Sequence, residues 1–156
     1  MRGFSIAAVL GVALVQASVA SAAPLPDGGV TAQDVARVLQ SKGFQAEVTT
    51  DKQGDPLVRS NSGGAKFGVY FYECKGRQRC PSIQFSAGFA STGITPQKVA
   101  EWNRSKRFGR VYLDKEDDPW VEMDIDVEHG ANTEAVANDL DRWTSVMGEF
   151  MRYIGR

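Results

Sequence analysis

In the segment KFGVYFYEC, residues 66–74, the side chains alternate between two faces with a period of two, which is typical of a β-strand. Phe67, Val69 and Phe71 fall on one face of a strand, and two tyrosines fall on the other. A strand with aromatic surface on both faces is typical of the middle of a sheet. The segment therefore predicts a central strand, beside which the rest of the chain must be arranged.

Shorter segments with the same alternation surround this strand. In residues 82–89, apolar side chains alternate with Gln84 and Ser86, so one face of that strand is expected to contact water. The connections between these segments are short, which makes neighbouring strands antiparallel. The other predicted strands are 45–50, 56–61, 110–114 and 120–127.

Three segments with a period near 3.6 predict helices. Thr31 followed by Asp34 has the form of a capping box, and Thr95-Pro96 places a proline at the first helical position. The longest helix, 133–153, carries an apolar stripe that must be buried against a sheet or a partner chain. The stripe consists of Val136, Leu140, Trp143, Met147, Phe150 and Ile154.

The resulting order, α-β-β-β-β-α-β-β-α, predicts a two-layer α+β fold in which helices cover an antiparallel sheet. With 156 residues, of which 42% are hydrophobic, the chain is long enough for one core, and we expect one domain over residues 31–156. Residues 23–30 are rich in proline and glycine and are predicted to form a flexible leader.

Residues 1–22 have the pattern of a secretory signal peptide. Arg2 precedes an apolar run at 4–15 that is too short to anchor the chain in a bilayer, and Ala20-Ser-Ala22 fits a cleavage site. We expect cleavage after Ala22 and a mature protein that is periplasmic or secreted, without contact with the membrane. The alternative is a buried N-terminal helix or an uncleaved anchor.

The chain contains two cysteines, Cys74 and Cys80, on either side of a tight turn. In an oxidising compartment such a pair predicts a disulfide that closes the turn. A redox-active pair would more typically have the spacing C-x-x-C at the start of a helix. The spacing therefore favours a structural bridge.

Charge and motifs exclude several classes of function. The chain has 18 basic and 19 acidic residues, and the basic segments 75–79 and 104–110 do not alternate with aromatic residues, so we expect no nucleic-acid partner. His129 is the single histidine, and the sequence contains no nucleophile elbow, no zinc-protease motif and no phosphate-binding loop. We expect no catalytic residue, no metal and no cofactor.

The predicted strand 120–127 carries the most prominent polar pattern. Glu122, Asp124, Asp126 and Glu128 share one face of it, with neighbouring carboxylates about 7 Å apart along the strand. A solvated outer face explains these residues. A weak Ca²⁺ site or contact with a basic partner is the alternative, and the first three acidic residues are therefore a candidate binding surface.

Several segments carry a family resemblance: FGVYFYEC (67–74), CPSIQFSAGF (80–89), VAEWN (99–103), RFGRVYLD (107–114) and the closing amphipathic helix. Over about residues 31–154 the chain resembles the YbjN family, described as regulators of bacterial sensory transduction. The resemblance implies a fold similar to that of type III secretion chaperones, which are small α+β proteins that bind extended segments of client proteins and often dimerise. It implies no catalytic residue.

Within these segments, Trp102-Asn103 is the most recognisable dipeptide and forms a second candidate binding surface. The alternative is a core tryptophan beside an asparagine that satisfies backbone groups at the end of a helix. The signal peptide and the cysteine pair distinguish this chain from cytoplasmic members of the family.

The sequence thus predicts a non-enzymatic periplasmic module that binds another polypeptide through a sheet edge or a helical groove. The competing class is a small ion-dependent or hydrolytic protein that uses the acidic strand 122–128. A third alternative is a homodimer formed through the helix at 133–153.

Overall fold

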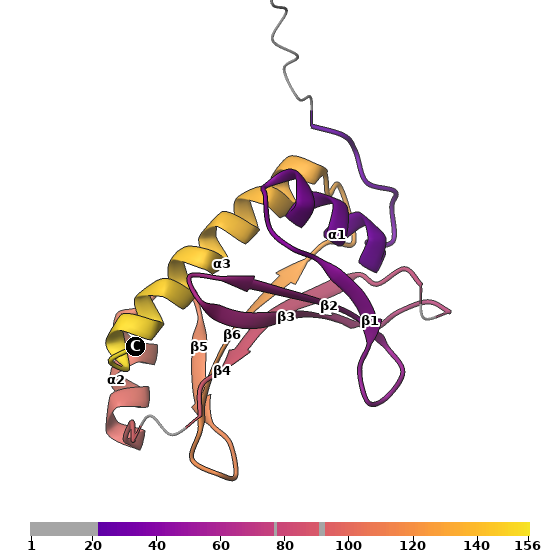
Figure 1. Cartoon of the computed structure of the whole chain (residues 1–156). Helices are drawn as coiled ribbons and strands as arrows, with labels where there is room; N and C mark the ends of the chain where they lie inside the picture. Colours follow the sequence, from indigo (N-terminus) through magenta and orange to yellow (C-terminus); the bar gives the residue numbers. More distant parts are fainter. Residues whose placement is uncertain (1–21, 77, 91–92) are drawn as a thin grey trace, which may run out of the picture.

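A computed structural model describes residues 22–156 apart from 77, 91 and 92 (Figure 1). The predicted signal peptide lies outside the described residues except for Ala22, so its cleavage stays a prediction. The predicted order of helices and strands is confirmed. The elements are α1 (Ala32–Ser41), β1 (Glu47–Thr50), β2 (Pro56–Ser62), β3 (Ala65–Tyr72), β4 (Ser82–Gly88), α2 (Pro96–Ser105), β5 (Arg110–Leu113), β6 (Pro119–Asp126) and α3 (Thr133–Tyr153).

The six strands form one sheet in the order β1-β2-β3-β4-β6-β5, and every neighbouring pair is antiparallel. The first four strands follow one another along the sheet because their connections are short. After α2 the chain returns as a second hairpin, in which β6 pairs with β4 and β5 forms the edge. The prediction that β3 lies inside the sheet is confirmed.

Helices α1 and α3 cover one face of the sheet (Figure 1). The apolar stripe of α3 is buried there, which settles whether it packs on a sheet or on a partner chain. Trp143 lies at the centre, with its ring 5.9 Å from that of Phe67 and 5.7 Å from that of Phe85 between centroids. All three side chains are almost fully buried, so this face holds the hydrophobic core.

The predicted capping box of α1 is confirmed. The hydroxyl oxygen of Thr31 accepts from the amide of Asp34, and the Asp34 carboxylate accepts from the amide of Thr31. Burial alone would raise the pKa of Asp34, but its hydrogen bonds from Thr31 and the charge of Arg37 outweigh burial and lower it. The carboxylate therefore stabilises the helix start in its charged form.

The predicted disulfide between Cys74 and Cys80 is confirmed. Cys80 is fully buried, and its backbone exchanges two hydrogen bonds with Val30, at 3.0 and 2.9 Å. The disulfide therefore closes the β3–β4 connection, and the backbone hydrogen bonds of Cys80 join that connection to the segment that precedes α1.

Residues 23–30 differ from the flexible leader that their composition predicted. The amide of Leu25 donates to the carbonyl of Ala131, and the amide of Gly28 donates to that of Glu128. Ala23 also pairs with Thr133 at the start of α3. Backbone hydrogen bonds along its length therefore join this segment to the rest of the folded chain.

Among the helices of the described residues, none has the length and apolar character needed to cross a membrane.

Candidate functional site

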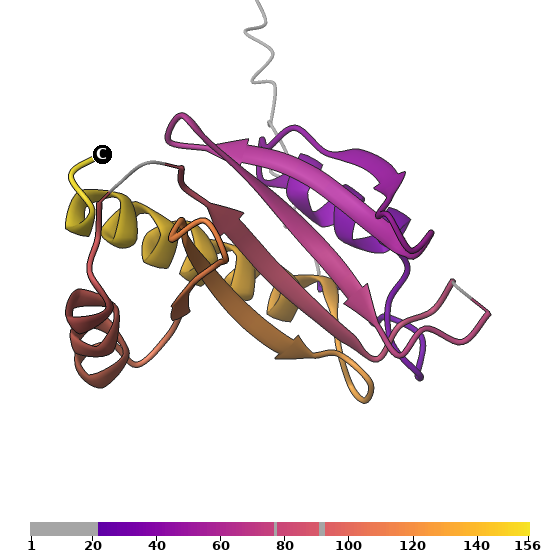
Figure 2. The same cartoon turned by 90° about the horizontal axis from the view of Figure 1, so that it is seen from below.

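The second face of the sheet, called here the open face, has no described helix over it. Figure 2 looks onto this face, with α3 behind the sheet and α2 beside it. Because side chains alternate along each strand, the residues between the core positions all point to this side. They include Leu57, Arg59, Lys66, Tyr70, Tyr72, Gln84, Ser86, Arg110, Tyr112, Trp120, Glu122 and Asp124.

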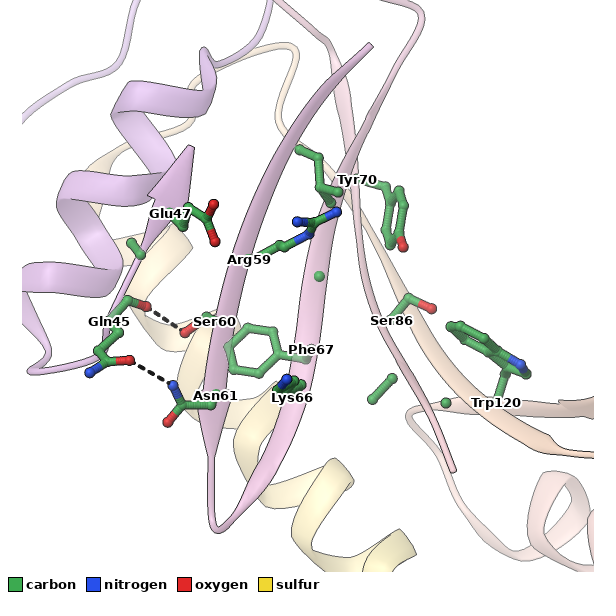
Figure 3. Close-up of a pocket in the computed structure, with 15 residues that line it drawn as sticks. Gln45, Glu47, Arg59, Ser60, Asn61, Lys66, Phe67, Tyr70, Ser86 and Trp120 are labelled. Atoms are coloured by element: carbon green, nitrogen blue, oxygen red, sulfur yellow. Dashed lines mark hydrogen bonds between the residues drawn. The ribbon is translucent and has the colours of Figure 1, made fainter. Parts of the chain in front are cut away.

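A groove of about 650 Å³ lies on the open face, over β1, β2, β3 and β4 (Figure 3). Its volume is in the range of pockets that enclose a small molecule or a few residues of a peptide. Its floor includes Gly68, Ser86 and Gly88, and its rim includes Arg59 and Lys66.

Two aromatic rings flank the floor of the groove. A Cβ atom at position 68 would lie 2.8 Å from Cε2 of Tyr70, and one at position 88 would lie 2.6 Å from Cε2 of Trp120. Each ring therefore covers a glycine, which is the residue that permits such close approach. Ser86 lies between the two rings in Figure 3.

The indole of Trp120 is held in place by a hydrogen bond. Its Nε1 donates to Oδ2 of Asp114 at 2.9 Å. This bond, together with hydrogen bonds from the amides of Asp118 and Glu116, lowers the pKa of Asp114. The carboxylate thus stays ionised at neutral pH and fixes the ring over the glycine.

Arg59 and Lys66 bring positive charge to the groove. Both side chains are exposed, and neither makes an ion pair or a side-chain hydrogen bond with another described residue. Lys66 pairs with Asn61 across β2 and β3, so it is a diagonal neighbour of Arg59 on the same face. Diagonal neighbours are about 7–8 Å apart, close enough for one ligand to reach both.

The end of the groove near β1 is fixed by hydrogen bonds between β2 and the residue before β1. The hydroxyl of Ser60 donates to the backbone carbonyl of Gln45 at 2.6 Å, and Nδ2 of Asn61 donates to Oε1 of Gln45 at 3.1 Å (Figure 3). These two contacts hold the wall of the groove without using its cations.

The other half of the open face is occupied by a polar network centred on Glu122, whose side chain is nearly buried. Arg110 Nη2 donates to Oε2 of Glu122 at 2.7 Å, and the Tyr112 hydroxyl donates to Oε1 at 2.9 Å. Ser86 adds a longer bond to the same Oε1 at 3.4 Å. Both oxygens of this carboxylate therefore have hydrogen-bond donors within the chain.

A second arm of the network contains Asp124. Gln84 Nε2 donates to Oδ1 of Asp124 at 2.7 Å, and the hydroxyl of Tyr72 donates to Oε1 of Gln84 at 3.1 Å. Burial raises the pKa of Tyr72, and the negative charges of Glu122 and Asp124 raise it further. In the same way, burial and the hydrogen bond to Glu122 raise the pKa of Tyr112 to about 12.

These contacts correct the expectation that the polar face of β4 is in water, and on β6 they correct it for Glu122, while Asp124 and Asp126 are exposed as expected. Ser86 and Glu122 are 3% and 8% exposed, and Gln84 is 9% exposed. Long side chains on the neighbouring strands, above all Tyr72 and Tyr112, lie over them and complete their hydrogen bonds. A period of two shows which face a residue occupies, but it does not show whether long side chains on the neighbouring strands cover that residue.

Each acidic residue on β6 has its own hydrogen-bond donor. Asp124 binds Gln84, and Oδ1 of Asp126 accepts from the amide of Glu128 at 2.9 Å. Within the described part of the chain, no group of three or more His, Cys, Asp and Glu side chains is placed to hold a metal ion. The carboxylates that the sequence grouped together thus have separate partners in the sheet.

The other candidate surface, Trp102-Asn103, has a structural role. Trp102 is 1% exposed and packs against Phe150 and Tyr153, so its indole does not lie on the surface. Its Nε1 donates to the carbonyl of Gly109, while the Asn103 amide exchanges two hydrogen bonds of 2.9 Å with the backbone of Val111. The dipeptide joins α2 to β5, as the alternative interpretation expected.

Sequence reasoning did not single out Arg59, Lys66, Tyr70 or Trp120. A signal for three of them was present, since period two places them on the face of 56–61 and 66–74 that is opposite the apolar one. What the pattern lacked was the position of β6 beside β4, which brings Trp120 over Gly88.

These features define the class of the protein: a small α+β protein whose single antiparallel sheet has one face packed on helices and one face left for a groove. Residues 31–156 match the YbjN family model, described as "Putative bacterial sensory transduction regulator". The chain belongs to the YbjN family. A search of curated proteins finds no match to the chain.

Proposed function

We propose that this protein is a non-enzymatic regulatory module that acts outside the cytoplasm by binding another polypeptide in the groove of its open face. The regulatory description of the family supports the first part of this proposal. The groove supports the second, because an uncovered sheet face with aromatic rings and free polar side chains is suited to an extended chain.

The observation that carries the proposal is the pair of unpaired cations, Arg59 and Lys66, beside the rings of Tyr70 and Trp120. In the other half of the open face, Glu122 has its partners within the chain, since Arg110 and Tyr112 donate to its carboxylate. A ligand is therefore the natural partner for the groove, since exposed cations beside apolar surface provide both charge and contact area.

Action outside the cytoplasm is supported by the disulfide and by the signal peptide that the sequence predicts. Disulfides persist in oxidising compartments and are rare in the cytosol. Fractionation of the native host followed by N-terminal sequencing tests this part. We expect the mature protein in the periplasm or the medium, beginning at Ala23, and a full-length cytosolic product would contradict it.

Site-specific crosslinking in the native host tests the binding function. A photoreactive residue at position 66, in the groove, should crosslink to one reproducible polypeptide. The matched control is position 115, an exposed lysine in the β5–β6 turn, where that product should be absent. Equal crosslinking at both positions, or none at position 66, would overturn the proposal.

A further inference from the structure

We infer that the groove selects acidic segments: a carboxylate of the bound polypeptide lies between Arg59 and Lys66, and the apolar side chain next to it rests between Tyr70 and Trp120. This inference rests on the proposed function and adds the chemistry of the partner. It follows from charge, spacing and shape, taken in turn.

Charge comes first. Arg59 and Lys66 are exposed in the groove, and the side chain of neither is paired with a described residue. Glu47 also lines the groove and pairs with Arg59 in the β1–β2 register, yet no ion pair joins their side chains. In Figure 3 the Arg59 side chain extends from β2 in the direction of Tyr70, away from Glu47. Its guanidinium is therefore available for a bidentate carboxylate contact.

The spacing of the two cations suits an extended acidic segment. The diagonal positions of Arg59 and Lys66 place their backbones about 7–8 Å apart. In an extended peptide, side chains on the same face repeat about every 7 Å. One acidic side chain can therefore contact both cations, or two acidic side chains at alternate positions can contact one each.

Shape comes third. Beyond the cations, the rings of Tyr70 and Trp120 lie over Gly68 and Gly88, so ring surface lines this part of the groove. Tyr70 and Trp120 border it with ring surface, and the position of each is set by the glycine that it covers. An apolar side chain adjacent to the carboxylate would pack on these rings and bury their exposed surface, which favours binding.

The other half of the open face limits what else can bind. Glu122, Asp124 and Asp126 lie on β6, next to β4 and the floor of the groove. A polyphosphate chain would have to pass close to these carboxylates, which repel it, and among the described residues that line the groove Arg59 and Lys66 are the only cations to attract it. A short acidic peptide segment is small enough to contact the cations without crossing β6.

Selection from a random dodecapeptide library tests the inference with the intact mature protein as bait. We expect enriched peptides to carry Asp or Glu adjacent to an aromatic or aliphatic residue. The leading peptide, synthesised with Gln or Asn in place of its acidic residues, should bind about 10-fold more weakly, because charge-assisted hydrogen bonds are lost. Affinity should also fall as salt is added.

The variant Arg59→Gln/Lys66→Gln should bind the acidic peptide about 10-fold more weakly than the wild type does, while its unfolding midpoint is unchanged. The matched control is Arg104→Gln/Lys115→Gln, which removes the same charges from exposed positions outside the groove and should bind as the wild type does.

The possible results test the acidic preference and polypeptide binding separately. Enrichment of peptides without acidic residues, or equal affinity for the acidic and amide forms, would overturn the acidic preference and leave polypeptide binding standing. If no peptide is enriched and a sulfated oligosaccharide is instead retained through Arg59 and Lys66, both the inference and the proposed function fail.

Discussion

The two faces of the sheet are built from the same strands but are completed in different ways. On the covered face, Phe67, Phe85 and Trp143 are buried by a helix of the same chain. On the open face, one half is completed by hydrogen bonds around Glu122, and the other half keeps Arg59 and Lys66 unpaired. The comparison shows where function can reside: in the part of the molecule whose charges the chain does not satisfy by itself.

The largest expected effect lies on the covered face. Trp143→Ala removes a fully buried indole that contacts two phenylalanine rings, so the free energy of unfolding should fall by about 3–5 kcal/mol. Urea denaturation measures this change. The matched variant Trp120→Ala, on the open face, should lose less than half as much, because its ring is only partly buried. Equal losses would mean that the open face is part of the core.

A smaller effect is expected within the polar network. Glu122→Gln keeps the shape of the side chain but places an amide where Arg110 and Tyr112 need an acceptor, so unfolding should become easier by about 1–3 kcal/mol. Asp124→Asn is the control, because Asp124 is exposed and its change should stay within about 0.5 kcal/mol. A Glu122→Gln variant as stable as the wild type would show that the network contributes little.

Reduction of the disulfide should affect both faces together. Opening the Cys74–Cys80 bridge restores entropy to the unfolded chain and should cost about 2 kcal/mol. Circular dichroism with and without reductant should show a lower melting temperature and an unchanged folded spectrum at 25 °C. Complete unfolding on reduction would mean that the contact between Cys80 and Val30 holds much more of the fold than its two hydrogen bonds indicate.

The smallest expected effect is a pH dependence on the open face. The pKa of Tyr112 is about 12 in the folded protein, above the ordinary value of 10, so folding favours its protonated form. The stability that this group contributes is fully present below pH 10 and is lost as the pH rises toward 12. Tyr112→Phe should therefore show a shallower fall in stability over that window, and an unchanged slope would contradict the assignment.

The sequence predicted the fold well because its local signals agree with one another. The alternation in 66–74, the capping box at Thr31 and the stripe of the last helix each lead to the observed element. The disulfide was predicted for a similar reason, since two cysteines on either side of a tight turn are expected to form a bridge in an oxidising compartment.

The site was harder to predict because it depends on contacts between strands that are distant in the chain. Glu122 was expected in water, yet Arg110 and Tyr112 cover it only because β5 folds back onto β6. Trp102 was a candidate for the surface, yet its apolar ring is buried against α3. The sequence did not indicate Arg59 and Lys66 as site residues, because only the three-dimensional structure shows that they have no partner among the described residues.

The most direct test of the central claim is an amide chemical-shift map of the ¹⁵N-labelled mature protein titrated with the selected acidic peptide. We expect the shifted amides to lie in β2, β3 and β4 around Arg59, Lys66 and Ser86 and at Trp120 in β6, with α1 and α3 unaffected. Shifts confined to the helices, or to β6 and its acidic residues, would contradict binding in the groove.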